Sequence, residues 1–190
     1  MLEQLLELDT ELFLYLNGLG SSTWDGLWLV ITDEFTFAPL YAILLFLIYK
    51  NYGLKPLLIM VVVIAAMITF TDQTTNIVKR SVLRFRPCAC EDIMDMIRYI
   101  AERCSSNRSF FSGHAANSMA AAVFGGLVLR PYYKKLIFIL LFWSFIVAYS
   151  RIYVGVHYPI DILCGMTFGA LAGFGFYKLN KYLLKRFTSK

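Results

Sequence analysis

The chain has 190 residues, of which 58% are hydrophobic and 16% are charged, with a mean hydropathy of +0.61. Soluble globular proteins are nearer half apolar and a quarter charged, so this composition excludes an ordinary soluble domain. The length predicts one membrane domain over residues 1–190, and the net charge of +5 does not indicate nucleic acid, because ten of the eighteen basic residues lie at the ends of apolar segments.

The first predicted element is a helix over residues 1–20. Its leucines recur at roughly helical spacing among acidic residues, which predicts an amphipathic helix that lies on the outer membrane surface. The alternative is a short sixth transmembrane span, which would move the N-terminus inside. The segment has no basic region before its apolar residues, so we do not expect a cleaved signal peptide.

Five apolar segments follow, at residues 25–49, 56–78, 111–129, 136–155 and 160–178. Each is long enough to cross about 30 Å of hydrocarbon as a helix. The sequence therefore predicts an all-α, integral membrane helical bundle with about five to six transmembrane helices.

The positions of the basic residues predict the orientation of this bundle. One set of segment ends carries Lys50, Lys55, Arg130, Lys134, Lys135, Lys178, Lys181, Lys185, Arg186 and Lys190, and no acidic residue. Basic ends are retained in the cytoplasm, so we expect a cytoplasmic C-terminus and, with five spans, an exterior N-terminus.

Three polar clusters then share the outer side of the membrane. They are KRSVLRFRP at residues 79–87, FSGH at residues 111–114 and SRIYVGVHYPID at residues 150–161. Both histidines of the chain belong to these clusters. Polar and ionisable residues at membrane depth are costly unless they are paired or used, so the clusters predict one site at the outer interface.

The three clusters resemble the signatures of the type 2 phosphatidic acid phosphatase family, K-x6-R-P, P-S-G-H and S-R-x5-H-x3-D. The resemblance covers residues 56–178, which we take as the catalytic core, and residues 88–110 form an outer loop within it. One departure is Phe111, which stands where the family has proline.

The resemblance implies a role for each motif residue. His157 is the nucleophile that forms a phosphohistidine, His114 is the general acid, and Asp161 orients His157. The implied phosphate-binding residues are Lys79, Arg86, Ser112, Gly113 and Arg151. The chemistry fits these roles, because arginine offers a planar fork for phosphoryl oxygens and a helix N-terminus favours anions. No metal or cofactor is required.

Several charged residues fall outside the motifs. Arg80 and Arg84 are candidates for cations that snorkel to the lipid headgroups, and the alternative is that one of them meets a second phosphate of the substrate. Asp72 precedes Lys79 by two helical turns, and we expect it to support the phosphate-binding cations or to be a wetted helix end. Asp33 and Glu34 lie in a predicted span, where ionised groups usually face a site.

The outer loop carries three of the four cysteines, and oxidation is permitted on that side. We expect a disulfide from Cys104 to Cys88 or Cys90, a choice that the sequence leaves open. Cys164 lies within a predicted span.

The predicted function is a metal-independent lipid phosphatase of the bacterial inner membrane, with its active site facing the periplasm or exterior. Undecaprenyl diphosphate is the favoured substrate, and phosphatidylglycerophosphate and lipid A phosphates are alternatives. A lipid phosphotransferase would use the same phosphohistidine. A lipid carrier or scramblase with a vestigial site is the alternative of another class.

Overall fold

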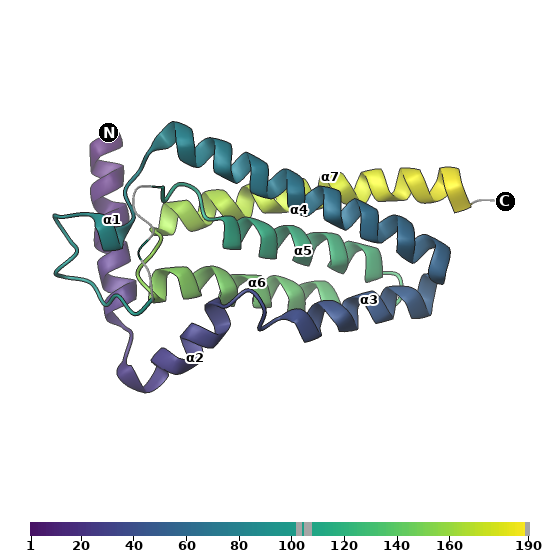
Figure 1. The fold of residues 1–190 in the computed structure, drawn as a ribbon, viewed down its shortest axis with the longest axis horizontal. Coiled ribbons are helices and arrows are strands. Elements are labelled where there is room, and N and C mark those ends of the chain that lie inside the picture. The colour runs from purple at the N-terminus through teal and green to yellow at the C-terminus, as the bar shows by residue number, and fades with distance from the viewer. Residues whose placement is uncertain (102–103, 105–107, 189–190) are drawn as a thin grey trace.

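The computed structural model describes residues 1–101, 104 and 108–188, and these residues form an all-helical bundle without a strand (Figure 1). The elements are α1 (Leu2–Gly18), α2 (Ser22–Thr32), α3 (Ala38–Tyr52), α4 (Leu54–Val82), the 3-10 turn η1 (Pro87–Ala89), α5 (Gly113–Leu129), α6 (Leu136–Tyr153) and α7 (Pro159–Thr188).

Three stretches are long and apolar enough to cross a membrane by length and composition, namely Leu54–Ala89, α6 and α7. They correspond to the predicted spans 56–78, 136–155 and 160–178, although α7 continues for ten residues beyond its predicted end. The predicted span 111–129 is the shorter apolar helix α5. The expected all-α membrane bundle is therefore confirmed.

The predicted span 25–49 is wrong as a single helix, because the chain turns between α2 and α3. The carboxylate of Asp33 accepts a hydrogen bond from the Phe35 amide at 2.8 Å, and the Thr36 hydroxyl donates to the Val30 carbonyl at 2.6 Å. Such local side-chain bonds compete with helical ones. Pro39 then lies in the first turn of α3, where proline is tolerated.

Helices α5 and α7 approach each other so closely that only small residues fit between them. A Cβ atom on Gly165 would lie 2.5 Å from the Ser112 carbonyl oxygen, and one on Gly173 would lie 2.6 Å from the Ala120 carbonyl oxygen. Gly169 meets the Ala116 carbonyl in the same way. This glycine stripe packs inside the bundle and fixes the start of α5 against the start of α7.

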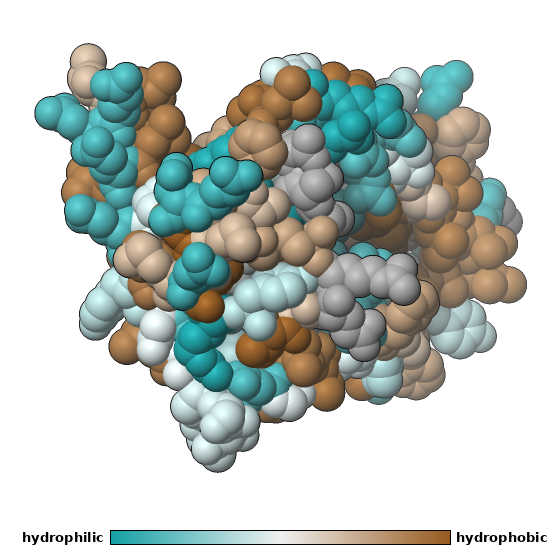
Figure 2. Space-filling view, turned by 60° about the vertical axis from the view of Figure 1, so that its left-hand side comes forward, coloured by the Kyte–Doolittle hydropathy of each residue, from teal (hydrophilic) through white to brown (hydrophobic). Residues whose placement is uncertain are grey.

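Helix α1 crosses the end of the bundle opposite to the C-terminus (Figure 1). It carries a buried stripe of Asp9, Phe13 and Asn17, and its hydrophilic and hydrophobic flanks are visible in Figure 2. The Asn17 amide donates to the carbonyls of Arg98, Ile152 and Tyr153, each at 3.0 Å. The predicted first helix is thus present and is pinned to the bundle. The hydrophobic flank is exposed, with Leu2, Leu5, Leu8, Leu12, Tyr15 and Leu19.

The predicted outer loop contains a disulfide between Cys88 and Cys104, and Cys90 is free. This resolves the open choice of pairing. The bond joins the residue next to Pro87 to the far part of the loop, where Arg98 pairs with Asp25 of α2 at 3.0 Å. The loop is thereby connected to both α2 and the chain around Arg86.

Candidate active site

A cavity of about 590 Å³ opens among α3, α4, α5, α6 and the segment that links α2 to α3. Its polar part is lined by Lys79, Arg86, Gly113, His114, Arg151 and His157, which come from all three sequence clusters. Its apolar part is lined by Leu44, Leu45, Ile48, Ile64, Met67, Ile68 and Phe124. The cavity therefore has a cationic part and an apolar part that continue into each other within the bundle.

His157 lies on the wall of this cavity, in the turn between α6 and α7. Its side chain is 2% exposed, and its Nδ1 atom lies 3.3 Å from the Ser109 hydroxyl and 3.5 Å from the Asp161 carboxylate. The turn needs a glycine at position 155, because Gly155 has a φ of +82°, which other residues rarely adopt. A Cβ atom added there would also lie 3.0 Å from the carbonyl oxygen of Arg98.

Burial lowers the pKa of His157 to about 3; Asp161 opposes this effect, and the cations Arg86 and Arg151 add to it. The imidazole is therefore neutral at pH 7. Because Nδ1 faces Ser109 and Asp161, Nε2 is the nitrogen left to react with a bound molecule.

The carboxylate of Asp161 is fully buried and is held from several directions. It accepts hydrogen bonds from Arg84 Nη1 at 2.9 Å, from the Tyr158 amide at 3.0 Å and from the Ser109 hydroxyl. The Ser109 amide in turn donates to the Arg84 carbonyl at 2.8 Å. Asp161 is thus fixed beside the histidine that it was predicted to orient.

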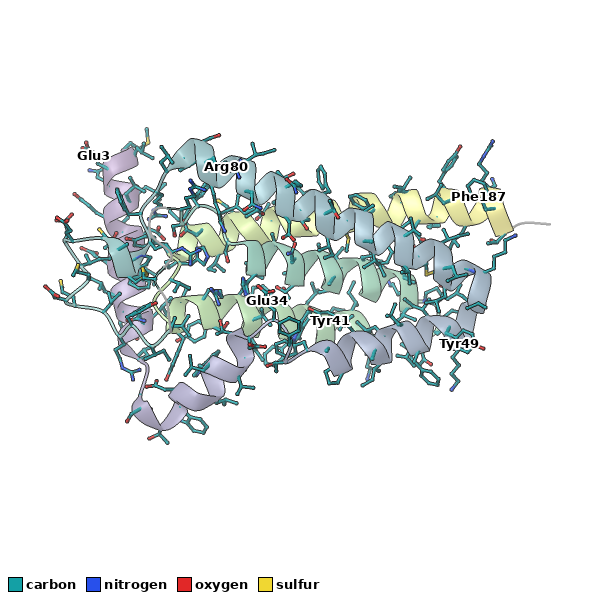
Figure 3. The ribbon with its side chains drawn as sticks, viewed as in Figure 1. Glu3, Glu34, Tyr41, Tyr49, Arg80 and Phe187 are labelled. Carbon is teal, nitrogen blue, oxygen red and sulfur yellow. A yellow bond between two sulfur atoms is a disulfide. The ribbon has the colours of Figure 1, made fainter. Side chains whose placement is uncertain are left out.

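Arg84 does not snorkel to the headgroups, and that interpretation is wrong. Its side chain is 16% exposed, bridges Asp161 and Asp9, and places its guanidinium 3.8 Å from the centre of the Tyr158 ring. Arg80, by contrast, is exposed near the end of α4 (Figure 3). The reason is that Leu83 ends α4 in a left-handed conformation, so the chain after it turns inward over the site.

The start of α5 faces the same point. The Ser112 hydroxyl accepts a hydrogen bond from the Ala115 amide at 3.5 Å, and the Ser112 amide donates to the Asp161 carbonyl at 3.1 Å. His114 lines the cavity, with its Nε2 atom 3.6 Å from the carboxylate of Glu34. Figure 3 shows Glu34 on the segment between α2 and α3.

The three predicted phosphate-binding cations gather without acidic partners. Among the described residues, Lys79, Arg86 and Arg151 form no ion pair with a carboxylate. The Nε atoms of Arg86 and Arg151 are buried without a hydrogen-bond partner, although Arg151 also donates to the Thr32 hydroxyl through Nη1. Buried donors of like charge without acceptors form a site for an anion.

Three acidic residues, Asp33, Glu34 and Asp72, also line this cavity. The Asp72 carboxylate accepts a hydrogen bond from the Asn117 amide at 2.7 Å and shares the cavity with Lys79. In the described part of the chain, no three His, Cys, Asp or Glu side chains gather closely enough to hold a metal ion.

Comparison with known proteins shows the family. The family model described as the PAP2 superfamily matches residues 55–185, which is more than half of the chain. The chain belongs to the PAP2 superfamily.

Curated relatives of this PAP2 protein are named phosphatases. It is 36% identical to the lipid A 4'-phosphatase of Bacteroides thetaiotaomicron, over 100% of this chain and 84% of the relative. It is 31% identical to the lipid A 4'-phosphatase of Porphyromonas gingivalis, over 97% of this chain and 78% of that relative. It is 26% identical to the undecaprenyl-diphosphatase of Sulfolobus acidocaldarius, over 90% of this chain and 78% of that relative. The protein is thus a phosphoric ester hydrolase of the membrane.

Two solved structures share the fold. One is the transmembrane PAP2-type phosphatidylglycerolphosphate phosphatase of Bacillus subtilis, with a TM-score of 0.74 and 21% identity over 97% of this chain and 89% of that one. The other is Aquifex aeolicus LpxE, with a TM-score of 0.66 and 23% identity over 90% and 95%.

Sequence reasoning missed three residues of this PAP2 site, namely Asp9, Arg84 and Ser109. Ser109 precedes the FSGH cluster and gave no signal, because serine is common in loops. Asp9 did give a signal in the sequence, because it is a charged residue one helical turn before Phe13, on the face of α1 that is buried.

Proposed function

We propose that this membrane phosphatase hydrolyses a phosphate monoester of lipid A and so releases inorganic phosphate. The observation that carries this proposal is the identity of 36% and 31% to two proteins named lipid A 4'-phosphatase, over nearly the whole chain. Undecaprenyl diphosphate, the substrate favoured from the sequence, becomes the second candidate, supported by a relative of 26% identity.

The chemistry of the cavity wall supports a sugar headgroup. Asp33, Glu34 and Asp72 lie on the wall that also carries the cations. Carboxylates accept hydrogen bonds from sugar hydroxyl and amide groups, but they repel a second phosphate. A phosphorylated disaccharide therefore suits this wall better than a diphosphate does.

The first step of the proposed reaction is phosphoryl transfer to His157. The phosphoryl group lies among Lys79, Arg86, Arg151 and the backbone N–H groups at the start of α5, and Nε2 of His157 attacks phosphorus. A P–N bond forms while the P–O bond to the lipid breaks, and His114 gives its proton to the leaving oxygen. Asp161 holds the imidazole that becomes positively charged.

The second step returns the enzyme to its starting state. Water attacks the phosphohistidine, His114 takes the proton from this water, and the P–N bond breaks to release inorganic phosphate. A lipid acceptor in place of water gives the phosphotransferase reaction with the same residues, so the acceptor decides between the two reactions.

We also propose that the site faces the exterior or periplasm and that the C-terminus is cytoplasmic. The α3–α4 junction, the α5–α6 connection and the C-terminus lie together at the end of the bundle opposite to α1 (Figure 1). These are the segments that carry the basic residues, and basic ends favour the cytoplasm. The exposed leucines of α1 would then rest in the outer interface.

The test is the inorganic phosphate released by the detergent-solubilised protein, with chelator, from lipid A, undecaprenyl diphosphate, phosphatidylglycerophosphate and phosphatidate. We expect lipid A to be hydrolysed fastest and His157→Ala to abolish release. Faster release from undecaprenyl diphosphate would reject the proposed substrate. Transfer of phosphate to a second lipid, without inorganic phosphate, would reject the hydrolase reaction.

A further inference from the structure

The carboxylate that faces His157 is connected to α1 by a continuous chain of ion pairs. Arg84 Nη1 lies 2.9 Å from one oxygen of Asp161, and Arg84 Nη2 lies 2.7 Å from an oxygen of Asp9. The other oxygen of Asp9 accepts a hydrogen bond from the Ile160 amide at 2.8 Å. Asp9 therefore contacts both the arginine and the first turn of the helix that carries Asp161.

This arrangement divides the two oxygens of Asp161 between different donors. Oδ1 accepts from Arg84, whereas Oδ2 accepts from Ser109 and the Tyr158 amide and faces Nδ1 of His157. A carboxylate held at one oxygen is less restricted in rotation about its Cβ–Cγ bond than a carboxylate held at both oxygens. With Arg84 on Oδ1, the plane of the carboxylate is fixed and Oδ2 stays toward the histidine.

Burial makes the connection rigid. The side chains of Asp9 and Asp161 are 1% and 0% exposed, and the Tyr158 ring covers the guanidinium of Arg84. Two carboxylates in one buried cluster need a shared cation, and Arg84 reaches each of them with a separate nitrogen, a spacing that the single nitrogen of a lysine does not reproduce.

We propose that Arg84, held by Asp9 of α1, is a positioning residue for Asp161 and through it for His157. This inference rests on the proposed role of His157 as the nucleophile. Asp9 lies outside residues 55–185, which the family model matches. Helix α1 is therefore a working part of the active site as well as a contact with the membrane surface.

The size of the expected effect follows from the geometry. The Nδ1 atom of His157 is already 3.5 Å from Asp161, so a small rotation of the carboxylate breaks the alignment. Misplacement of a reacting group by about 1 Å lowers a rate by about 100-fold. We expect Arg84→Gln to lower kcat by about 100-fold and Asp9→Asn by about 10-fold, with KM unchanged, because neither residue lines the cavity.

The experiment compares kcat and KM for wild type, Asp9→Asn, Arg84→Lys and Arg84→Gln. The substrate is whichever of the four lipids named above the wild type hydrolyses fastest. Arg80→Gln is the matched control, because it removes an exposed arginine four residues earlier in the chain. Thermal unfolding in the same detergent identifies any variant that does not fold. If Arg84→Gln does not fold, Asp9→Asn, which keeps the shape of the side chain, tests the proposal in its place.

The decisive measurement is a double-mutant cycle in the Asp161→Asn background. If Arg84 acts through Asp161, the substitution Arg84→Gln costs little more once the carboxylate is gone. An equal loss with and without Asp161, or a rise in KM with kcat unchanged, would overturn the proposal in favour of direct phosphate binding. Full activity of folded Asp9→Asn and Arg84→Gln would also overturn it. A wild type without activity on any lipid would instead reject the proposed function.

Discussion

The two sides of the active site are built in opposite ways. On the braced side, which comprises Asp9, Arg84, Ser109, Asp161 and His157, each charged group has a partner within the protein. On the open side, which comprises Lys79, Arg86 and Arg151, none of the three cations forms an ion pair with a carboxylate among the described residues.

Under the proposed mechanism, the difference corresponds to what each side does during the reaction. A group that orients a nucleophile must not move, so its hydrogen bonds are completed by the chain itself. A group that receives a phosphate must keep its donors available, and the repulsion between its cations is relieved when the anion binds. The braced side should therefore depend on geometry, whereas the open side should depend on charge.

The largest expected effect is on the braced side. Asp161→Asn should lower kcat by about 10⁴-fold, since the histidine loses the group that holds its tautomer, and His157→Ala should abolish turnover. Initial rates of phosphate release at saturating lipid measure both. A loss of less than tenfold for Asp161→Asn would mean that the two sides do not differ in this way.

Substitutions on the open side should lower the rate less than those on the braced side, and they should not lower the unfolding temperature. Arg86→Gln should lower kcat/KM by about 10²- to 10³-fold, because one donor to the phosphoryl oxygens is lost. The same variant should unfold at an equal or higher temperature than wild type, because a source of like-charge repulsion is removed. Differential scanning of both proteins, without phosphate and with it, checks this. A clear fall in unfolding temperature without phosphate would contradict it.

The disulfide is expected to contribute both to stability and to the open side of the site. Cys88 and Cys104 close a loop with a sequence separation of 16, and such a bond contributes about 3 kcal/mol to stability. Cys88→Ser should lower the free energy of unfolding by about this amount. It should raise KM more than it lowers kcat, because the loop begins two residues after Arg86. Cys164→Ser, which removes a free cysteine, is the control, and equal behaviour of the two variants would contradict the prediction.

The next expected effect, which over any one pH unit is smaller than that of the disulfide, concerns pH and stability. The pKa of His157 lies at about 3 in the folded protein and near 6.5 when the chain unfolds, because burial disfavours the charged ring. Below pH 6.5 the unfolded chain takes up a proton that the folded protein excludes. The free energy of unfolding should therefore fall by about 1.4 kcal/mol per pH unit from pH 6.5 toward pH 3. His157→Gln should lack this part of the dependence, and parallel curves for the two proteins would show that burial does not set the pKa.

The sequence predicted the parts of the fold that long apolar segments determine. The predicted segments 56–78, 136–155 and 160–178 correspond to α4, α6 and α7 because hydropathy and length decide such helices. The segment 25–49 was misjudged, since Asp33 and Thr36 make local side-chain hydrogen bonds that turn the chain between its two apolar halves. A local turn of this kind gives little signal in a hydropathy pattern.

The site was predictable only where a motif reports it. Each of the three clusters contributes residues to the wall of one cavity, namely Lys79, Arg86, Gly113, His114, Arg151 and His157, whereas Ser112 and Asp161 lie behind that wall. Arg84 lies inside the first cluster, yet spacing alone does not distinguish an arginine that reaches lipid from one that reaches a buried carboxylate. That distinction depends on Asp9, which is 75 residues away in the sequence.

The long sequence separations of the α1 contacts have a consequence for biosynthesis. Helix α1 is made first, but Asp9 waits for a residue 151 positions later, and Asn17 waits for partners 135 and 136 positions later. Contacts between such distant residues form late, after the intervening helices have packed. In a nascent chain on the ribosome, the contacts that hold Asp161 beside His157 therefore cannot form until the start of α7 has been synthesised, and under the proposed mechanism hydrolysis cannot begin before then.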